Sequence, residues 1–155
     1  MSPGARTFWT MQISLFTDYG LRTLLRLASE PERVFTTSEI AEEYSLSRNH
    51  LLKVVQSLAN AGYIVATRGV GGGIQLAKSP EEIFIGEVVR LLEGSGEMVN
   101  CIGKSGPCIL LPGCTLKFHL RKAERAFYAY LNDVSLAKCL AKWTAPSRRI
   151  SAVVE

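Results

Sequence analysis

Residues 36–62 read TTSEIAEEYSLSRNHLLKVVQSLANAG and contain two helical patterns separated by a short turn. In the first pattern Thr37 is a good N-cap, and apolar side chains follow it at helical spacing. In the second pattern Ser47 is expected to cap a longer helix that ends near Ala61, with Gly62 just beyond its end. Two helices joined by a turn of this length indicate a helix-turn-helix.

The first turn of the second helix carries side chains that suit the reading of double-stranded DNA. Arg48, Asn49 and His50 are expected to be exposed there, and Lys53 follows one turn later. Arginine pairs bidentately with guanine, and asparagine with adenine, in the major groove. We therefore predict that these four residues and Ser47 contact DNA, and that His50 is a DNA contact rather than a metal ligand.

A β-hairpin is expected directly after these helices. Residues 63–68 and 74–77 have the composition of strands, and the glycine-rich tip GVGGG lies between them. Arg68 at the base of the tip is placed for the minor groove, and Gly71 and Gly72 let the tip approach a DNA backbone closely. The order of elements is that of a winged helix-turn-helix. A merely flexible hairpin is the alternative.

An amphipathic helix is expected before the helix-turn-helix. Its pattern runs up to Pro31, and Thr17 or Asp18 can cap its start. Arg22 and Arg26 lie four residues apart on one face of this helix. Such a pair is typical of a solvated face, although it would also suit phosphates.

Beyond the hairpin, residues 85–92 and 136–143 are expected to form short helices. Between them, apolar residues recur at the spacing 4-3-4-3: Leu116, Leu120, Ala123, Phe127 and Tyr130. Heptad spacing favours contact with a partner helix, so we expect a homodimer, with packing inside the chain as the alternative.

Three of the four cysteines, Cys101, Cys108 and Cys114, lie within fourteen residues that also contain glycine and proline. Such a loop can wrap around a metal or cluster. The spacings C-x6-C and C-x5-C are wider than the knuckles of structural zinc sites, which favours an iron–sulfur cluster over zinc or free thiols. Cys139 has helical spacing with apolar neighbours and is expected to be buried.

Composition bounds the remaining possibilities. The chain has 155 residues, 47% of them hydrophobic, and a net charge of +4, which permits an anionic partner. No apolar run approaches the roughly 18 residues that span a bilayer, and the first ten residues do not resemble a signal peptide. We expect a cytoplasmic protein with reduced thiols and no membrane partner. No catalytic arrangement stands out, so no enzyme is expected.

Taken together, these residues resemble the family of winged-helix iron–sulfur transcription regulators. The resemblance covers residues 11–143 and rests on the three cysteines and on four motifs: MQISLFTDYGLR at 11–22, SRNH at 47–50, RGVGGG at 68–73 and IGEVVR at 85–90. Within the family, FTDYG, SRNH and VNC at 99–101 are most similar to the branch that senses nitric oxide.

The resemblance implies a mainly α-helical chain with a small β-hairpin. Its expected parts are an N-terminal extension (1–10), a winged helix-turn-helix DNA-binding domain (11–93), a cluster-binding loop (94–114), a dimerisation helix with a short terminal helix (115–143) and a tail (144–155). The implied function is a transcriptional repressor that binds a pseudo-palindromic operator as a homodimer and responds to nitric oxide.

The resemblance also implies a ligand set. Cys101, Cys108 and Cys114 would hold a cluster, 4Fe–4S in preference to 2Fe–2S, and Asp18 of the partner subunit would be its fourth ligand. For Asp18 the alternative is an N-cap of its own helix.

In the branch that reports iron–sulfur status, a histidine follows the third cysteine by three residues, where this chain has Lys117. A protonated lysine has no lone pair to give. His119, two residues further on, would point elsewhere and is expected on the surface. The alternative functions are a related regulator that senses iron–sulfur status or redox state, a regulator with structural zinc, and a small redox protein.

Overall fold

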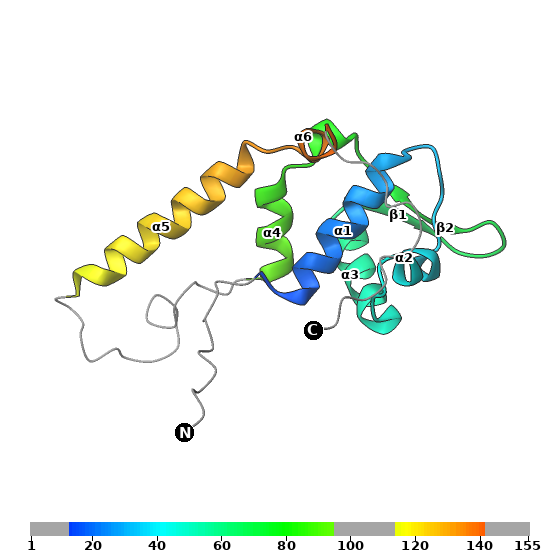
Figure 1. Cartoon of the computed structure of the whole chain (residues 1–155), viewed down its shortest axis with the longest axis horizontal. Coiled ribbons are helices and arrows are strands. Elements are labelled where there is room, and N and C mark those ends of the chain that lie inside the picture. Colours follow the sequence, from blue (N-terminus) through cyan, green and yellow to red (C-terminus); the bar gives the residue numbers. More distant parts are fainter. Residues whose placement is uncertain (1–12, 95–113, 142–155) are drawn as a thin grey trace, which may run out of the picture.

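Residues 13–94 and 114–141 are described by the computed structural model (Figure 1). The elements, in chain order, are α1 (Leu15–Ser29), α2 (Thr37–Glu43), α3 (Arg48–Asn60), β1 (Ile64–Thr67), β2 (Gly73–Leu76), the 3-10 helix η1 (Pro80–Glu82), α4 (Ile85–Glu93), α5 (Thr115–Asn132) and α6 (Leu136–Leu140). The strands pair antiparallel, with Ile64 opposite Leu76 and Thr67 opposite Gly73. The prediction of a mainly helical fold with one hairpin is confirmed.

The hydrophobic core forms where α1 packs against α3 and α4. Its fully buried members include Leu24, Leu51, Leu58 and Val88, and burial of each such side chain contributes about 1.5–3 kcal/mol. Gly20 of α1 lies at the crossing of the three helices. A Cβ atom at this glycine would overlap Leu92 Cδ1 of α4 and would lie 3.4 Å from Val54 Cγ1 of α3. Leu92 would have to shift to admit a larger side chain here, so glycine favours this close approach of α1 and α4.

The helix caps differ from the sequence prediction. Ser14, not Thr17 or Asp18, caps α1, because its Oγ accepts a hydrogen bond of 3.2 Å from the Thr17 amide. Thr36, not Thr37, caps α2 in a capping box with Glu39, whose carboxylate accepts a 2.7 Å hydrogen bond from the Thr36 amide. In both cases the hydroxyl that caps the helix belongs to a residue earlier in the chain than the predicted one.

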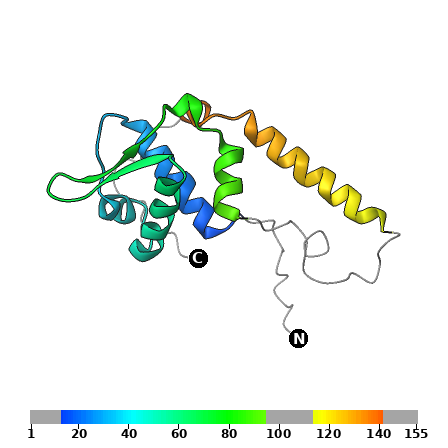
Figure 2. The same ribbon diagram turned by 180° about the vertical axis from the view of Figure 1, so that it is seen from behind.

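Helix α5 extends away from the other helices and contacts them mainly near its C-terminal end (Figures 1 and 2). Phe127, Tyr128 and Leu131 pack against the core there, next to α4. At the opposite end Leu116 is 57% exposed and Phe118 is 66% exposed. The first turns of α5 therefore present apolar side chains that no other described part of the chain covers. No described helix is long and apolar enough to cross a membrane.

The prediction that Cys139 is buried is wrong. Helix α6 is only five residues long and turns Leu136 into the core, which leaves Cys139 exposed. Partial burial by its neighbours still raises the pKa of the Cys139 thiol.

Candidate nucleic-acid interface

The turn between α2 and α3 fixes the start of the second helix. Ser45 has a φ angle of +54°, a left-handed conformation that is uncommon for a residue other than glycine. The next residue, Leu46, donates a backbone hydrogen bond of 2.7 Å to the Ala41 carbonyl of α2. This tight turn gives the helix-turn-helix that the sequence predicted.

Helix α3 has one buried and one exposed face. Leu51, Val54, Val55 and Leu58 are buried against the core. Arg48, Asn49, His50 and Lys53 are exposed, as predicted. No hydrogen bond or ion pair joins these four side chains to another residue in the described part of the chain, so they are available to an external partner. Ser47 occupies the N-cap position, and its hydroxyl makes no capping hydrogen bond.

The hairpin β1–β2 forms the wing, and its tip projects from the body of the protein (Figure 1). Gly69 and Gly71 adopt φ angles of +99° and +76°. A Cβ atom at Gly72 would overlap the Thr67 carbonyl oxygen, so this position needs glycine to close the tip. Arg68 and Val70 are exposed at the base and end of the tip. The tip can therefore present an arginine to DNA.

Only one of the three candidate ligand cysteines lies in the described residues. Cys114 is the N-cap residue of α5, half-buried, with a free thiol that makes no capping hydrogen bond. Cys101 and Cys108 lie outside the described residues. Lys117 is half-buried one turn after Cys114, and His119 is exposed with its ring edge-on to Phe118 at 5.5 Å.

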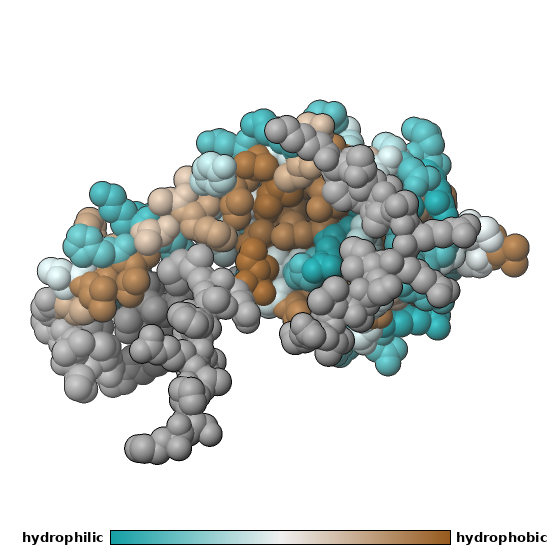
Figure 3. All heavy atoms as spheres, in the orientation of Figure 1, coloured by the Kyte–Doolittle hydropathy of each residue, from teal (hydrophilic) through white to brown (hydrophobic). Residues whose placement is uncertain are grey.

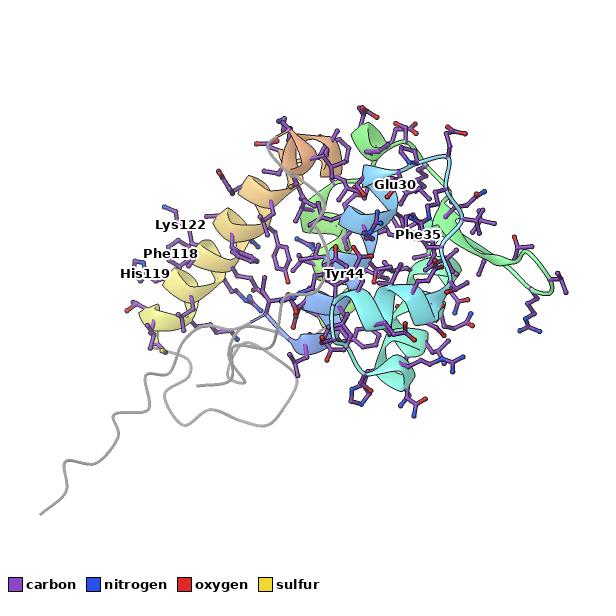
Figure 4. All side chains as sticks on the ribbon, turned by 45° about the vertical axis from the view of Figure 1, so that its right-hand side comes forward. Glu30, Phe35, Tyr44, Phe118, His119 and Lys122 are labelled. Atoms are coloured by element: carbon purple, nitrogen blue, oxygen red, sulfur yellow. The ribbon has the colours of Figure 1, made fainter. Side chains whose placement is uncertain are left out.

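Asp18 lies in the first turns of α1, where its carboxylate forms an ion pair of 2.9 Å with Arg22 Nε. The alternative prediction, that Asp18 is the N-cap of α1, is wrong because Ser14 is the N-cap residue. The start of α1 and the start of α5 lie well apart in Figures 1 and 4. Asp18 and Cys114 of one chain are therefore not brought together.

Two side chains have structural roles that the sequence did not reveal. Arg26, expected on a solvated face, is only 6% exposed and forms ion pairs with Glu43 and Glu30. Glu93, at the end of α4, accepts a hydrogen bond of 2.8 Å from the Ser14 amide at the start of α1. A buried arginine can be suspected where helical periodicity turns a charged position toward the core.

A protein-family model for Rrf2, described as an iron-dependent transcriptional regulator, matches residues 13–142. The chain belongs to the Rrf2 family. Members of the Rrf2 family are DNA-binding transcriptional regulators with a winged-helix fold, and this chain is accordingly a regulator and not an enzyme.

Three solved structures of similar proteins cover most of this chain. CymR of Staphylococcus aureus is 33% identical, and the match covers 84% of this chain and 98% of that chain with a TM-score of 0.65. IscR of T. potens is 26% identical, with 86% and 93% covered and a TM-score of 0.68. CymR of B. subtilis, named as its global cysteine regulator, is 27% identical, with 87% and 100% covered and a TM-score of 0.66.

Proposed function

We propose that this Rrf2-family chain is a transcriptional repressor of the NsrR type, whose affinity for operator DNA is controlled by an iron–sulfur cluster that senses nitric oxide. One observation carries the proposal most directly. Cys114, whose thiol is free, is the N-cap residue of α5. It is the last residue of the cysteine segment (94–114), which links the DNA-binding body to this projecting helix. A change in the ligation of that segment can therefore alter the position of α5 relative to the DNA-binding body.

The chemistry of the donor set fits such a cluster. Thiolates are soft ligands that suit iron–sulfur clusters and zinc. Cys114 lies at the N-terminus of the 18-residue helix α5, directly after the stretch of sequence that carries the other two cysteines. Cys101 and Cys108 would supply the other two thiolates. When bound, a 4Fe–4S cluster supplies an iron site that reacts with nitric oxide.

Asp18 is the proposed fourth ligand, contributed by the partner subunit. Its side chain is partly exposed, and among the described residues it is held by an i,i+4 ion pair with Arg22, an interaction worth about 0.2–0.5 kcal/mol. A partly exposed carboxylate held by such a weak ion pair can leave Arg22 and bind a metal ion instead. A carboxylate oxygen is a hard ligand, so that position would be the weakest in the ligand set.

The DNA contacts follow from the exposed face of α3 and from the wing. Arg48 and Asn49 would read base edges in the major groove, and Arg68 would enter the adjacent minor groove. Ser47, whose hydroxyl makes no capping hydrogen bond, would contact a phosphate. His50, Lys53 and the glycine tip (Gly71 and Gly72) would complete the contact. The DNA-binding domain would span residues 11–93.

A homodimer would place two such surfaces on a pseudo-palindromic operator. The apolar residues Leu116 and Tyr130 of the α5 seam are 57% and 72% exposed in the single chain. Figure 3 shows hydrophobic side chains gathered over α4 next to α5 on the same side of the protein. The exposure of these apolar side chains supports the proposed assignment of residues 115–143 to dimerisation, in which a second copy would cover them.

A second candidate is a regulator that responds to redox state or cysteine rather than to nitric oxide. It is favoured by the 33% identity to CymR of Staphylococcus aureus, which also matches in a structure described as its oxidized form at 34% identity. A regulator of this kind would use the thiols of the cysteine segment directly, or hold zinc there.

The two candidates are separated by the absorbance of protein purified without air. A cluster gives a brown protein whose visible absorbance falls during titration with nitric oxide, and DNA binding should fall over the same range. A colourless protein whose DNA affinity changes with thiol oxidation would support the second candidate instead. A brown protein whose DNA binding is indifferent to nitric oxide would contradict the proposed signal while leaving the cluster in place.

A further inference from the structure

Arg26 is a charged side chain buried in α1, away from the proposed DNA contacts. Its Nε donates hydrogen bonds of 2.9 and 2.8 Å to the two carboxylate oxygens of Glu43, and its Nη1 donates one of 2.8 Å to Glu30 Oε1. A buried charge is costly unless it is paired with good geometry. Burial opposes the charged form, but the hydrogen bonds to Glu43 and Glu30 outweigh it and raise the pKa of Arg26.

The guanidinium of Arg26 also contacts an aromatic ring in the loop between α1 and α2. Its Cζ atom lies 4.4 Å from the centroid of Phe35, and Arg33 Cζ lies at the same distance from that ring. Phe35 is fully buried. Arginine over an aromatic face adds a cation–π attraction to the packing of the ring. Figure 4 shows Phe35 and Glu30 near the C-terminal end of α1.

Phe35 is attached to the wing through its backbone. Its amide donates a hydrogen bond of 3.0 Å to the Ile74 carbonyl of β2, and the Ile74 amide donates one of 2.7 Å to the Phe35 carbonyl. A Cβ atom on the neighbouring Gly73 would overlap the Phe35 carbonyl oxygen. The loop and the base of the wing are therefore in close contact, and the position of Phe35 sets the position of β2.

Glu43 is the last residue of α2, directly before the turn that leads into α3. Arg26 thus contacts both parts of the proposed DNA-binding surface, the helix-turn-helix through Glu43 and the wing through Phe35. A lysine would keep the charge, but its single ammonium lacks the planar guanidinium that bonds Glu43 through Nε and Glu30 through Nη1 while covering the ring. The role of Arg26 therefore depends on the shape of its guanidinium as well as on its charge.

We propose that Arg26 is a positioning residue for DNA recognition, which holds α2 and the base of the wing in one relative orientation without touching DNA. This inference rests on the proposed function, in which α3 and the wing bind DNA together. If the wing is held by Arg26, the contribution of a wing contact such as Arg68 depends on Arg26. Two residues that act independently would show no such dependence.

A double-mutant cycle tests this coupling. The probe is a duplex that the wild-type protein selects from a randomised pool. Arg68→Ala should weaken binding by at least about fivefold in the wild-type background. In the Arg26→Lys background the same change should have an effect at least about threefold smaller. The salt slope of Arg26→Lys should fall by no more than the one unit or so that Arg68→Ala loses, because Arg26 itself touches no phosphate and only the Arg68 contact is weakened.

Arg90→Lys is the matched control. Arg90 Cζ lies 4.4 Å from the ring centroid of Tyr128, the same kind of contact made away from the wing and the helix-turn-helix. The loss caused by Arg68→Ala should be unchanged in this background. An equal loss in the Arg26→Lys and wild-type backgrounds would overturn the inference. If Arg26→Lys does not fold, Phe35→Leu, which keeps an apolar side chain but removes the ring, should give the same reduced coupling.

Hydrogen exchange of the free protein tests the inference without DNA. In Arg26→Lys the Ile74 amide should exchange at least about tenfold faster, while the buried Val88 amide of α4 keeps its wild-type rate. A purely structural role would accelerate both amides together, and this outcome would refute positioning. If the wild-type chain selects no DNA sequence at all, the proposed function fails, and the exchange rates alone decide whether Arg26 holds the wing.

Discussion

Ser14 and Glu93 are 79 residues apart in the sequence, and a hydrogen bond of 2.8 Å from the Ser14 amide to Glu93 Oε1 joins them. The contact ties the start of α1 to the end of α4, the point where the cysteine segment departs. Burial opposes ionisation of Glu93, but hydrogen bonds from Thr17 and Ser14 outweigh burial and lower its pKa. The charged form of Glu93 therefore stabilises the folded protein.

This contact predicts a loss of stability in acid. Because the folded pKa of Glu93 is depressed, its contribution is present above the unfolded value of about 4.3 and is lost as the pH falls through the folded value. Glu93→Gln should lower the free energy of unfolding by about 1 kcal/mol at neutral pH, and by less in acid. Urea unfolding at a series of pH values measures both. An equal deficit at every pH would show that the carboxylate charge is not involved.

The cysteine segment predicts a clear difference between the four cysteines. Replacing Cys101, Cys108 or Cys114 by alanine should each give a protein without the visible absorbance of a cluster, because each removes a thiolate ligand. Cys139→Ala is the control and should retain its iron, since this thiol is exposed on α6. Iron and sulfide analysis of anaerobically purified variants gives the result. Wild-type iron content in any of the first three would remove that residue from the ligand set.

The exposed face of α3 predicts base-specific binding. Arg48→Ala should cost about 1–3 kcal/mol on the operator and relax specificity at one position, whereas Arg68→Ala should reduce the salt slope by about 1. Binding isotherms on operator and random duplexes at several salt concentrations separate the two effects. An equal loss on both duplexes would mean that Arg48 touches only phosphate.

If Asp18 is the fourth ligand, replacing it should change the chemistry of the cluster without removing the N-cap of α1. Asp18→Ala should keep three thiolate ligands but alter the cluster spectrum and the rate of reaction with nitric oxide. A thiolate binds iron more firmly than a carboxylate, so Asp18→Cys should slow that reaction. Ser14→Ala removes the true cap of α1 and is the control. It should cost about 1 kcal/mol of stability and leave the spectrum alone. Wild-type spectra and kinetics in both Asp18 variants would exclude ligation.

The seam on α5 predicts a homodimer. Leu116→Asp should give a monomer, because it places a charge in the proposed contact with the partner helix. Phe118→Asp is the matched control, since this residue is similarly exposed but lies outside the heptad positions. Sedimentation equilibrium measures the association state. Dissociation by both variants, or by neither, would assign the interface to another surface.

The helices and the hairpin could be predicted from the sequence because their periodicity is local. Leu51, Val54 and Leu58 repeat at helical spacing, and this pattern alone located α3 and its buried face. The exposure of Arg48 and Asn49 followed from the same pattern. These predictions needed no knowledge of distant residues.

Three details could not be predicted, because they depend on residues far apart or on small geometric choices. Arg26 is buried because Glu43, 17 residues later, supplies a carboxylate at the right place. The cap of α1 is Ser14, whose amide donates a hydrogen bond to Glu93, 79 residues later in the chain at the end of α4. Cys139 is exposed because α6 is too short to bury more than one face.

Helix α5 has a mechanical consequence. Its 18 residues form a rod about 27 Å long, attached near its C-terminal end, with Cys114 at the free end. A tilt of about 5° at the attachment would move Cys114 by about 2 Å, the length of a metal–ligand bond. If Cys114 is a ligand as proposed, the helix would act as a lever arm that converts a displacement of this residue into a rotation where α5 packs beside α4.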